Sequence, residues 1–230
     1  MHLFIKKLVL LSLVAFVFGQ NNVALITKVR GEIFHKAHDS DEYASAVKSG
    51  TQLKNKDWIK TGADGYIAIF FLDDKSQLKI KQDTEIQILG SEERGKINKT
   101  ISLDYGQVKA KVEKQKGEFK IVTPTSVASV KGTEFWMISE DGVDQIIGIQ
   151  GVVEVENRFS GGVVQVTTNQ TANSTPDGGL DTEETEGADI PDDPDDDTDD
   201  DAGNTNLHQL RIKLQNSSNE ERFIIIEYSE

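Results

Sequence analysis

The feature that most constrains the fold is a succession of short apolar or alternating runs between residues 23 and 166. The runs are rich in Val, Ile, Phe and Tyr, are separated by turn residues at intervals of about 8–12 residues, and show no helical period. This pattern predicts an all-β chain built as an elongated β-roll or solenoid-like stack of short strands, with a two-sheet β-sandwich as the alternative. The predicted strands are 24–29, 32–35, 57–60, 66–72, 77–81, 85–89, 101–104, 107–112, 118–122, 126–130, 134–138, 144–149, 152–156 and 163–167.

Alternation within the runs assigns side chains to the two faces of each strand, because successive residues point to opposite sides. Glycine-containing turns at 64–65, 104–106, 141–142 and 150–151 tolerate positive φ and are predicted to close hairpins. The side chains predicted to face the core are Leu78, Ile80, Ile86 and Ile88, and those predicted to face solvent are Lys79, Lys81, Glu85 and Gln87.

The N-terminus has the pattern of a secretory signal peptide. Lys6 and Lys7 precede an apolar run at 8–18, which is shorter than the roughly 20 residues that a membrane-spanning helix needs. We expect residues 1–19 to be removed and the mature chain to begin near Gln20. No second long apolar run follows, so the expected product is secreted or periplasmic, without a membrane span after cleavage.

Acidic residues are concentrated near the C-terminus. The net charge is −14, and residues 181–201 contain 13 Asp or Glu and no Lys or Arg. This composition predicts that residues 171–206 form a disordered acidic linker. Calcium binding is the alternative, because carboxylates alternate there as they do in calcium loops. The calcium ligands would be Asp195, Asp197, Asp199 and Asp201.

The last segment, residues 207–230, contains two apolar runs at 210–214 and 222–228 with a polar turn between them. This arrangement predicts a C-terminal β-hairpin. A lone hairpin is marginally stable in water, so we expect it to pack on the main domain or on a partner.

Most catalytic chemistries lack a sequence basis. The absence of Cys excludes disulfides, thiolate zinc sites and Cys nucleophiles, and the acidic charge disfavours nucleic-acid binding. No hydrolase, zinc-protease or phosphate-loop motif occurs, so no enzyme activity is expected. His35 and His38 are three residues apart but lack further ligands, which disfavours a metal site. The acidic pair Asp73 and Asp74 is expected in a solvated turn.

Two tryptophans leave a ligand site open as an alternative. Trp58 and Trp136 each lie in an apolar strand context, which favours core packing. Stacking on a carbohydrate ring is the alternative for either side chain.

Five segments, in this order and spacing, resemble the FecR domain: 60–69, 74–80, 102–108, 119–135 and 148–155. The structural positions that carry the resemblance are Gly62, Asp74, Gly106, Pro124, Gly132, Thr133 and Gly151. The chain departs from the family pattern at Lys75 and Asn169, where Gly is usual, and at Lys131, where Arg is usual. Of these replacements, Asn is the mildest because it tolerates positive φ.

The resemblance implies a FecR-like domain at residues 20–170, in a standalone secreted form. Such a domain is expected to be a non-enzymatic, extracytoplasmic binding and regulatory module without a cofactor. Its expected partner is an envelope protein or a second copy of itself, and not nucleic acid. A ligand-binding module for a carbohydrate or a metal chelate is the alternative function. At Gly132, the strongest motif is expected to need positive φ or a close backbone approach.

Overall fold

The computed structural model describes residues 22–45, 47–93, 96–114, 117–193, 195, 207–215 and 221–229. The expected signal peptide and Gln20 lie outside these residues. The described strands are β1 Asn22–Arg30, β2 Ile33–Lys36, β3 Gln52–Lys54, β4 Trp58–Thr61, β5 Tyr66–Phe71, β6 Gln77–Ile80, β7 Glu85–Glu93, β8 Lys96–Lys111, β9 Phe119–Val122, β10 Ser126–Val130, β11 Glu134–Glu140, β12 Val143–Gln150, β13 Val153–Asn157, β14 Val163–Val166, β15 Gln170–Ser174, β16 Leu180–Glu184, β17 Leu207–Gln215 and β18 Glu221–Ser229. One short 3₁₀ turn, η1 (Gly187–Asp189), follows β16.

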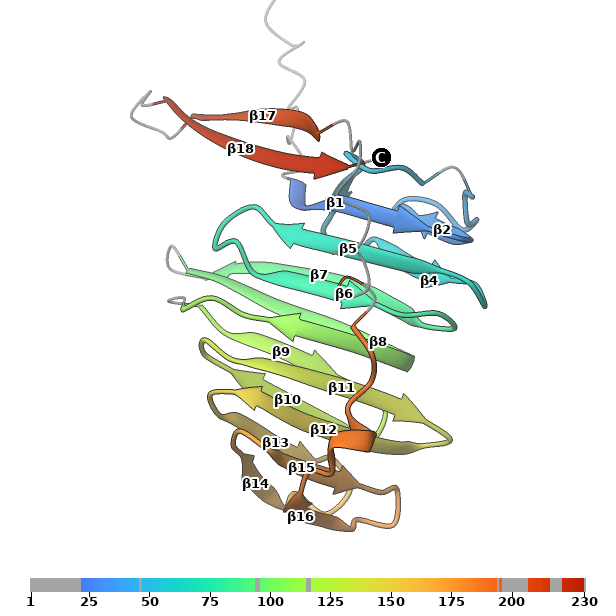
Figure 1. Cartoon of the computed structure of the whole chain (residues 1–230), viewed down its shortest axis with the longest axis vertical. Coiled ribbons are helices and arrows are strands. Elements are labelled where there is room, and N and C mark those ends of the chain that lie inside the picture. Colours follow the sequence, from blue (N-terminus) through green and yellow to red (C-terminus); the bar gives the residue numbers. More distant parts are fainter. Residues whose placement is uncertain are drawn as a thin grey trace, which may run out of the picture.

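Sixteen strands form one continuous, open sheet that folds into two layers (Figure 1). The layer called sheet A has the order β3-β1-β5-β6-β8-β11-β12-β15-β16, and sheet B has the order β2-β4-β7-β8-β9-β10-β13-β14. All neighbours are antiparallel except β8 and β9. The predicted all-β, elongated stack of short strands is therefore confirmed, and none of the described helices is long and apolar enough to cross a membrane.

Strand β8 belongs to both layers and joins them. Its first half pairs with β7 and β9 in sheet B, and its second half pairs with β6 and β11 in sheet A. The change of layer occurs at Gly106, whose φ is +106°. A Cβ there would lie 2.2 Å from Thr84 Oγ1, so only glycine fits without displacement. The predicted turn at 104–106 is wrong: the positive-φ glycine redirects one strand and does not separate two.

The core fills the space between the two layers. Leu78, Ile80, Ile86 and Ile88 are buried in it, as alternation predicts. The rings of Phe71 and Phe119, from opposite layers, meet edge to face with centroids 5.8 Å apart. Burial of these apolar side chains is the main stabilising contribution.

The chain beyond residue 170 differs from the predicted linker. β15 pairs with β12, and β16 pairs with β15, so residues 171–184 extend sheet A and are not disordered. Their sequence is too polar to show an apolar alternation, and backbone pairing holds them instead. Residues 194 and 196–206 of the predicted linker lie outside the described residues. The predicted C-terminal hairpin is confirmed, since β17 and β18 pair antiparallel beside β1 (Figure 1).

Candidate functional site

A row of lysines crosses the outer face of sheet A. Lys28 on β1, Lys79 on β6 and Lys109 on β8 point away from the core. The residues on either side of Lys79 and Lys109 are buried in the core, and Val29, next to Lys28, packs against it. Lys79 lies directly opposite Lys109, and Ala68 connects Lys28 with Lys79 in the same cross-strand register. We call Lys28, Lys79, Lys81 and Lys109 the lysine row.

An acidic segment of the same chain lies on this row. We call residues 185–193 together with Asp195 the acidic strap. It starts directly after β16, where the Thr185 N–H donates to the Asn169 carbonyl at 2.9 Å. From there it runs up the face of sheet A towards β1 (Figure 1). The sequence predicted solvent exposure for Lys79 and Lys81, whereas both point outward underneath this strap.

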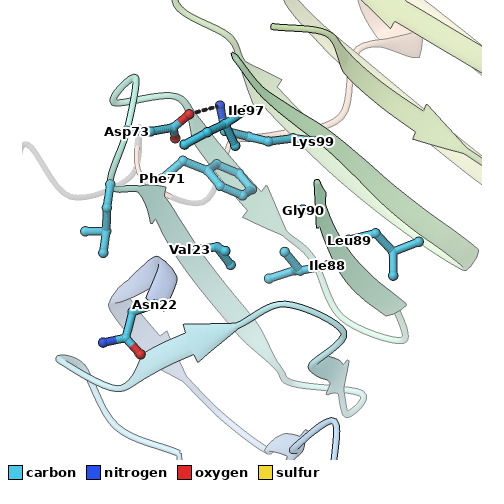
Figure 2. A pocket seen from close by; sticks show the side chains of 10 residues that line it. Asn22, Val23, Phe71, Asp73, Ile88, Leu89, Gly90, Ile97 and Lys99 are labelled. Atoms are coloured by element: carbon cyan, nitrogen blue, oxygen red, sulfur yellow. Dashed lines mark ion pairs between the residues drawn. The ribbon is translucent and has the colours of Figure 1, made fainter. Parts of the chain in front are cut away.

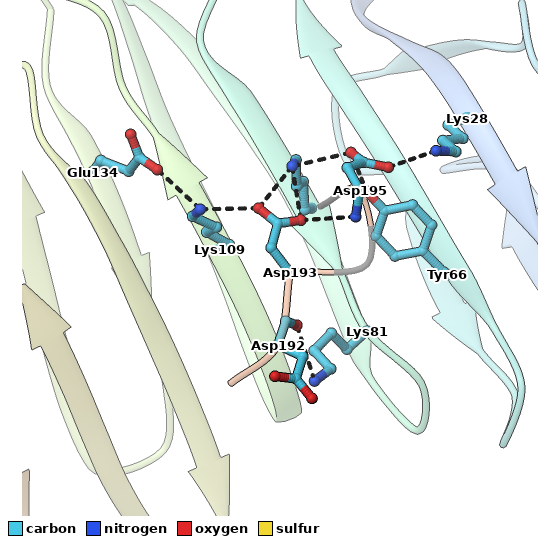
Figure 3. A network of polar contacts seen from close by, with 9 residues as sticks. Lys28, Tyr66, Lys81, Lys109, Glu134, Asp192, Asp193 and Asp195 are labelled. Carbon is cyan, nitrogen blue, oxygen red and sulfur yellow. Dashed lines mark hydrogen bonds and ion pairs between the residues drawn. The ribbon is translucent and has the colours of Figure 1, made fainter. Parts of the chain in front are cut away.

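Two strap carboxylates make most of the contacts (Figure 3). Lys79 Nζ donates to both oxygens of Asp193 at 2.8 Å and lies 3.0 Å from Asp195 Oδ2. Lys109 Nζ lies 2.9 Å from Asp193, and Lys28 Nζ lies 2.6 Å from Asp195. The Asp193 side chain is only 5% exposed. Three cations therefore surround two anions on a partly buried surface.

Further contacts complete the network. The Tyr66 hydroxyl donates to Asp195 Oδ2 at 2.8 Å, and Lys81 Nζ donates to the Asp192 carbonyl at 3.4 Å. Glu134 Oε1 lies 3.0 Å from Lys109 Nζ. The charges of Lys28, Lys79 and Lys109 are thus balanced by Asp193, Asp195 and Glu134.

The network shifts the pKa values of its members. Burial alone would raise the pKa of Asp195, but hydrogen bonds from Lys28, Tyr66 and Lys79 outweigh it and lower that pKa to about 2. The pKa of Asp193 is also lowered, because hydrogen bonds from Lys79 and Lys109 outweigh its burial. Burial and the hydrogen bond to Asp195 raise the pKa of Tyr66. The lowered pKa values of Asp193 and Asp195 favour charged carboxylates, and the raised pKa of Tyr66 favours a protonated hydroxyl that can donate to Asp195.

A small apolar cluster lies beside the lysine row on the same outer face. Trp136, directly opposite Lys109, is 1% exposed and packs with Ile138 and Ile147. The ammonium groups of Lys81 and Lys109 lie 5.7 and 6.0 Å from the Trp136 ring centroid. Trp136 is therefore buried, as predicted, but in this outer cluster and not between the layers. Trp58 is half-buried on the outer face of sheet B, with Lys36 Nζ 4.9 Å from its ring centroid.

Three of the predicted motif positions come together at one end of β11. Gly132 has a φ of +83°, as expected, and Gly151 has a φ of +90°. A Cβ on Gly151 would lie 3.0 Å from the Gly132 carbonyl oxygen. The Thr133 hydroxyl donates to the Val152 carbonyl at 3.1 Å. These residues lock two turns against each other, while Lys131 beside them is exposed.

Pro124 lies in the turn between β9 and β10. Arg158 Nη1 donates to the carbonyls of Thr123 and Pro124 at 2.6 and 3.2 Å, and the Thr125 hydroxyl donates to the Gly142 carbonyl at 2.9 Å. The motif turn is thus fixed by contacts with two later loops. Gly62, between β4 and β5, is required for another reason: a Cβ there would lie 2.8 Å from the Cβ of Glu32.

The turn between β5 and β6 holds a buried cation. Lys99, with a side chain only 4% exposed, places Nζ 2.7 Å from Asp73 and 2.6 Å from Asp74. The two acids lie in a turn, as predicted, but each pairs with this ammonium, and the Asp74 side chain is only 9% exposed. Lys75 follows with a φ of +67°, the conformation that a glycine would adopt without strain.

An apolar pocket of about 240 Å³ opens next to this ion pair (Figure 2). Its lining comes from both layers, with Val23 and Phe71 from sheet A and Ile88 and Ile97 from sheet B. Ligand pockets for drug-sized molecules span about 300–1,000 Å³, so this pocket suits a smaller apolar group.

His35 and His38, the histidines weighed as metal ligands, both lie beside Asp57, with His38 Nδ1 3.8 Å from Asp57 Oδ1. His35 Nε2 lies 2.9 Å from Asp57 Oδ2, and no group of three or more metal-ligating side chains occurs among the described residues. Asp195 is engaged by lysines. Asp197, Asp199 and Asp201, the other proposed calcium ligands, lie outside the described residues.

Residues 57–154 match the family model described as FecR protein. The resemblance predicted from the sequence is confirmed over these residues. Two crystal structures, each named a provisional anti-sigma factor from Parabacteroides distasonis, are similar to the chain with 16% identity and a TM-score of 0.48. Each similarity covers 56% of this chain and 60% of the solved chain. None of the curated proteins compared with the chain matches it.

Proposed function

We propose that this chain is a non-enzymatic, extracytoplasmic regulatory module that binds a protein partner through the lysine row. The FecR domain supports a regulatory role. The observation that carries the proposed mode of binding is the contact of Lys28, Lys79 and Lys109 with Asp193 and Asp195, since it is an example of this surface holding an acidic peptide segment.

The chemistry of the lysine row fits such a partner. Like charges directly opposite each other in a sheet are destabilising, so Lys79 and Lys109 need an anionic neighbour. The adjoining Tyr66 hydroxyl adds a hydrogen-bond donor. A peptide with carboxylates satisfies all of these groups.

The test is binding of a labelled synthetic peptide with the sequence of residues 187–201, measured by fluorescence anisotropy. The full-length chain carries Asp193→Asn and Asp195→Asn, so that its own carboxylates do not occupy the row. We expect saturable binding that is lost when Lys79→Gln and Lys109→Gln are added. The matched control adds Lys120→Gln and Lys131→Gln on the other layer and should bind normally. Equal binding with and without Lys79 and Lys109 would rule out this surface.

The apolar pocket favours a second candidate function, the binding of a small apolar ligand. Gly90 lines this pocket, and a Cβ on it would lie only 3.4 Å from Val23 Cγ1. Gly90→Val should therefore fill the space. An environment-sensitive apolar dye is expected to bind the natural chain and to lose affinity in this variant, whereas equal affinity would argue against use of the pocket.

A further inference from the structure

We propose that the acidic strap is a resident competitor, which occupies the lysine row and must leave before the acidic segment of a partner binds there. This inference rests on the proposed function and adds its regulation. It also defines the partner's chemistry: a segment that presents two carboxylates on residues two apart, as Asp193 and Asp195 do.

The two carboxylates act as one unit. The backbone N–H of Asp195 donates to Asp193 Oδ1 at 3.1 Å, and Lys79 contacts both side chains. Lys109 and Lys28 then hold the two outer sides of the pair. A partner that displaces the strap must supply anions to the same three ammonium groups, so a single isolated carboxylate is insufficient.

The bonds at the outer end of the strap are of a kind that can be exchanged, whereas Asp193, whose side chain is 5% exposed, is the buried part of the attachment. The side chains of Lys28 and Asp195 are each 27% exposed, and ion pairs with this degree of exposure are individually weak and screened by salt. Ile190, within the strap, is an exposed apolar side chain. Polar contacts therefore provide most of the described attachment, and a competing peptide can replace them with equivalent ones.

The strap also has an advantage over any partner, because it is covalently attached. Thr185 is fixed at the end of β16 by hydrogen bonds to Asn169 and Thr171. Attachment of this kind gives an effective concentration of the order of millimolar for a short flexible link. The apparent affinity for a partner equals the intrinsic affinity multiplied by the fraction of chains in which the strap has left the row. The strap thereby sets a threshold for binding.

The experiment compares the natural full-length chain with the Asp193→Asn, Asp195→Asn variant, using the labelled 187–201 peptide as the probe. If the strap competes, we expect the peptide to bind the variant at least about tenfold more tightly than the natural chain. The matched control is Asp181→Asn with Glu183→Gln on β16. It changes the net charge by the same amount away from the row and should retain the affinity of the natural chain.

The outcomes separate the two proposals. If the peptide binds the natural chain and the Asp193, Asp195 variant with equal, measurable affinity, the strap is not a competitor. The lysine row would remain a binding surface. A lack of binding to either protein would overturn the proposed function itself. A single-stranded oligonucleotide of equal charge serves as a specificity control. If it binds the variant as tightly as the peptide does, the lysine row recognises charge alone, which contradicts the proposal that its partner is an acidic peptide segment. Far-UV circular dichroism verifies that each variant keeps its strands.

Discussion

The ammonium group of Lys79 lies within 3.0 Å of the carboxylates of both Asp193 and Asp195, although Asp193 is 114 residues further along the chain. Lys79 is also the direct cross-strand neighbour of Lys109. The strap therefore neutralises two like charges that the sheet register forces together. Its attachment depends on the ionisation of two carboxylates, which makes it sensitive to pH.

Acid should release the strap. The pKa of Asp195 in the folded chain is about 2, below its ordinary value of 3.8, and the pKa of Asp193 is lowered too. A lowered pKa means that the stabilisation is complete above the ordinary value and is lost as the pH falls through the folded value. We expect release between about pH 4 and pH 2. Fluorescence of Trp136 in a Trp58→Phe background reports it, because Lys109 adjoins both Trp136 and Asp193.

The control for this titration is the Asp193→Asn, Asp195→Asn variant, in which no fluorescence transition is expected in the same range. Circular dichroism separates strap release from general unfolding. A transition that persists in the variant would assign the signal to other groups.

The sequence predicted the strands and their buried faces well, but it could not predict the strap. Alternation placed Lys79 on the outer face because Leu78 and Ile80 beside it are apolar. The alternation contains no information on which distant carboxylates cover that face, because complementary charges do not recur at a fixed spacing in a sequence. The strands β15 and β16 were missed for a related reason, because polar residues held by backbone pairing look like a linker.

The interpretation of Gly106 as a turn shows a different limit. A glycine with positive φ looks the same in a sequence whether it reverses a chain or redirects a strand between layers. Only the pairing of β8 with four neighbours separates the two cases.

Gly106→Ala should destabilise the domain strongly. The added Cβ would overlap Thr84, and φ at this position is +106°. We expect a loss of about 3 kcal/mol or more in the free energy of unfolding, measured with urea. Gly161→Ala is the control, since it also has positive φ, +69°, but nothing lies within 4 Å of the added Cβ. It should cost about 1 kcal/mol. Equal losses in both variants would show that the close approach to Thr84 is unimportant.

Lys75→Gly should stabilise the chain. Lys75 has a φ of +67°, which is strained for a residue with a long side chain, whereas Asn169 at +62° is of a type that tolerates this region. Relief of the strain, partly offset by the greater freedom of glycine in the unfolded chain, should give about 0.5–1 kcal/mol for Lys75→Gly. For Asn169→Gly we expect a change near zero. The reverse order of the two effects in thermal unfolding would contradict this account.

We expect Asn157 to be essential for the stability of the end of the sheet that β15 and β16 form. The predicted domain boundary at residue 170 left this end out. Asn157 is fully buried at the end of β13, and its Nδ2 donates to Ser174 Oγ at 2.8 Å and to the Thr175 carbonyl at 2.9 Å. Its Oδ1 accepts from the backbone N–H groups of Phe159 and Ser160 at 2.9 and 3.0 Å. One amide therefore ties the β13–β14 turn to the hairpin formed by β15 and β16.

Asn157→Ala leaves several buried polar groups without a partner, so we expect a loss of about 3–5 kcal/mol in the free energy of unfolding. Asn173→Ala, on β15 but half-buried and paired with Gln145 and Glu183, is the matched control and should stay within about 0.5 kcal/mol of the natural chain. Hydrogen exchange locates the effect, because amides of β15 and β16 should lose protection first in the Asn157 variant. If the Asn157 variant unfolds like the control, residues 170–184 contribute little to the stability of the domain. In energetic terms they would then behave as the predicted linker, although they form strands.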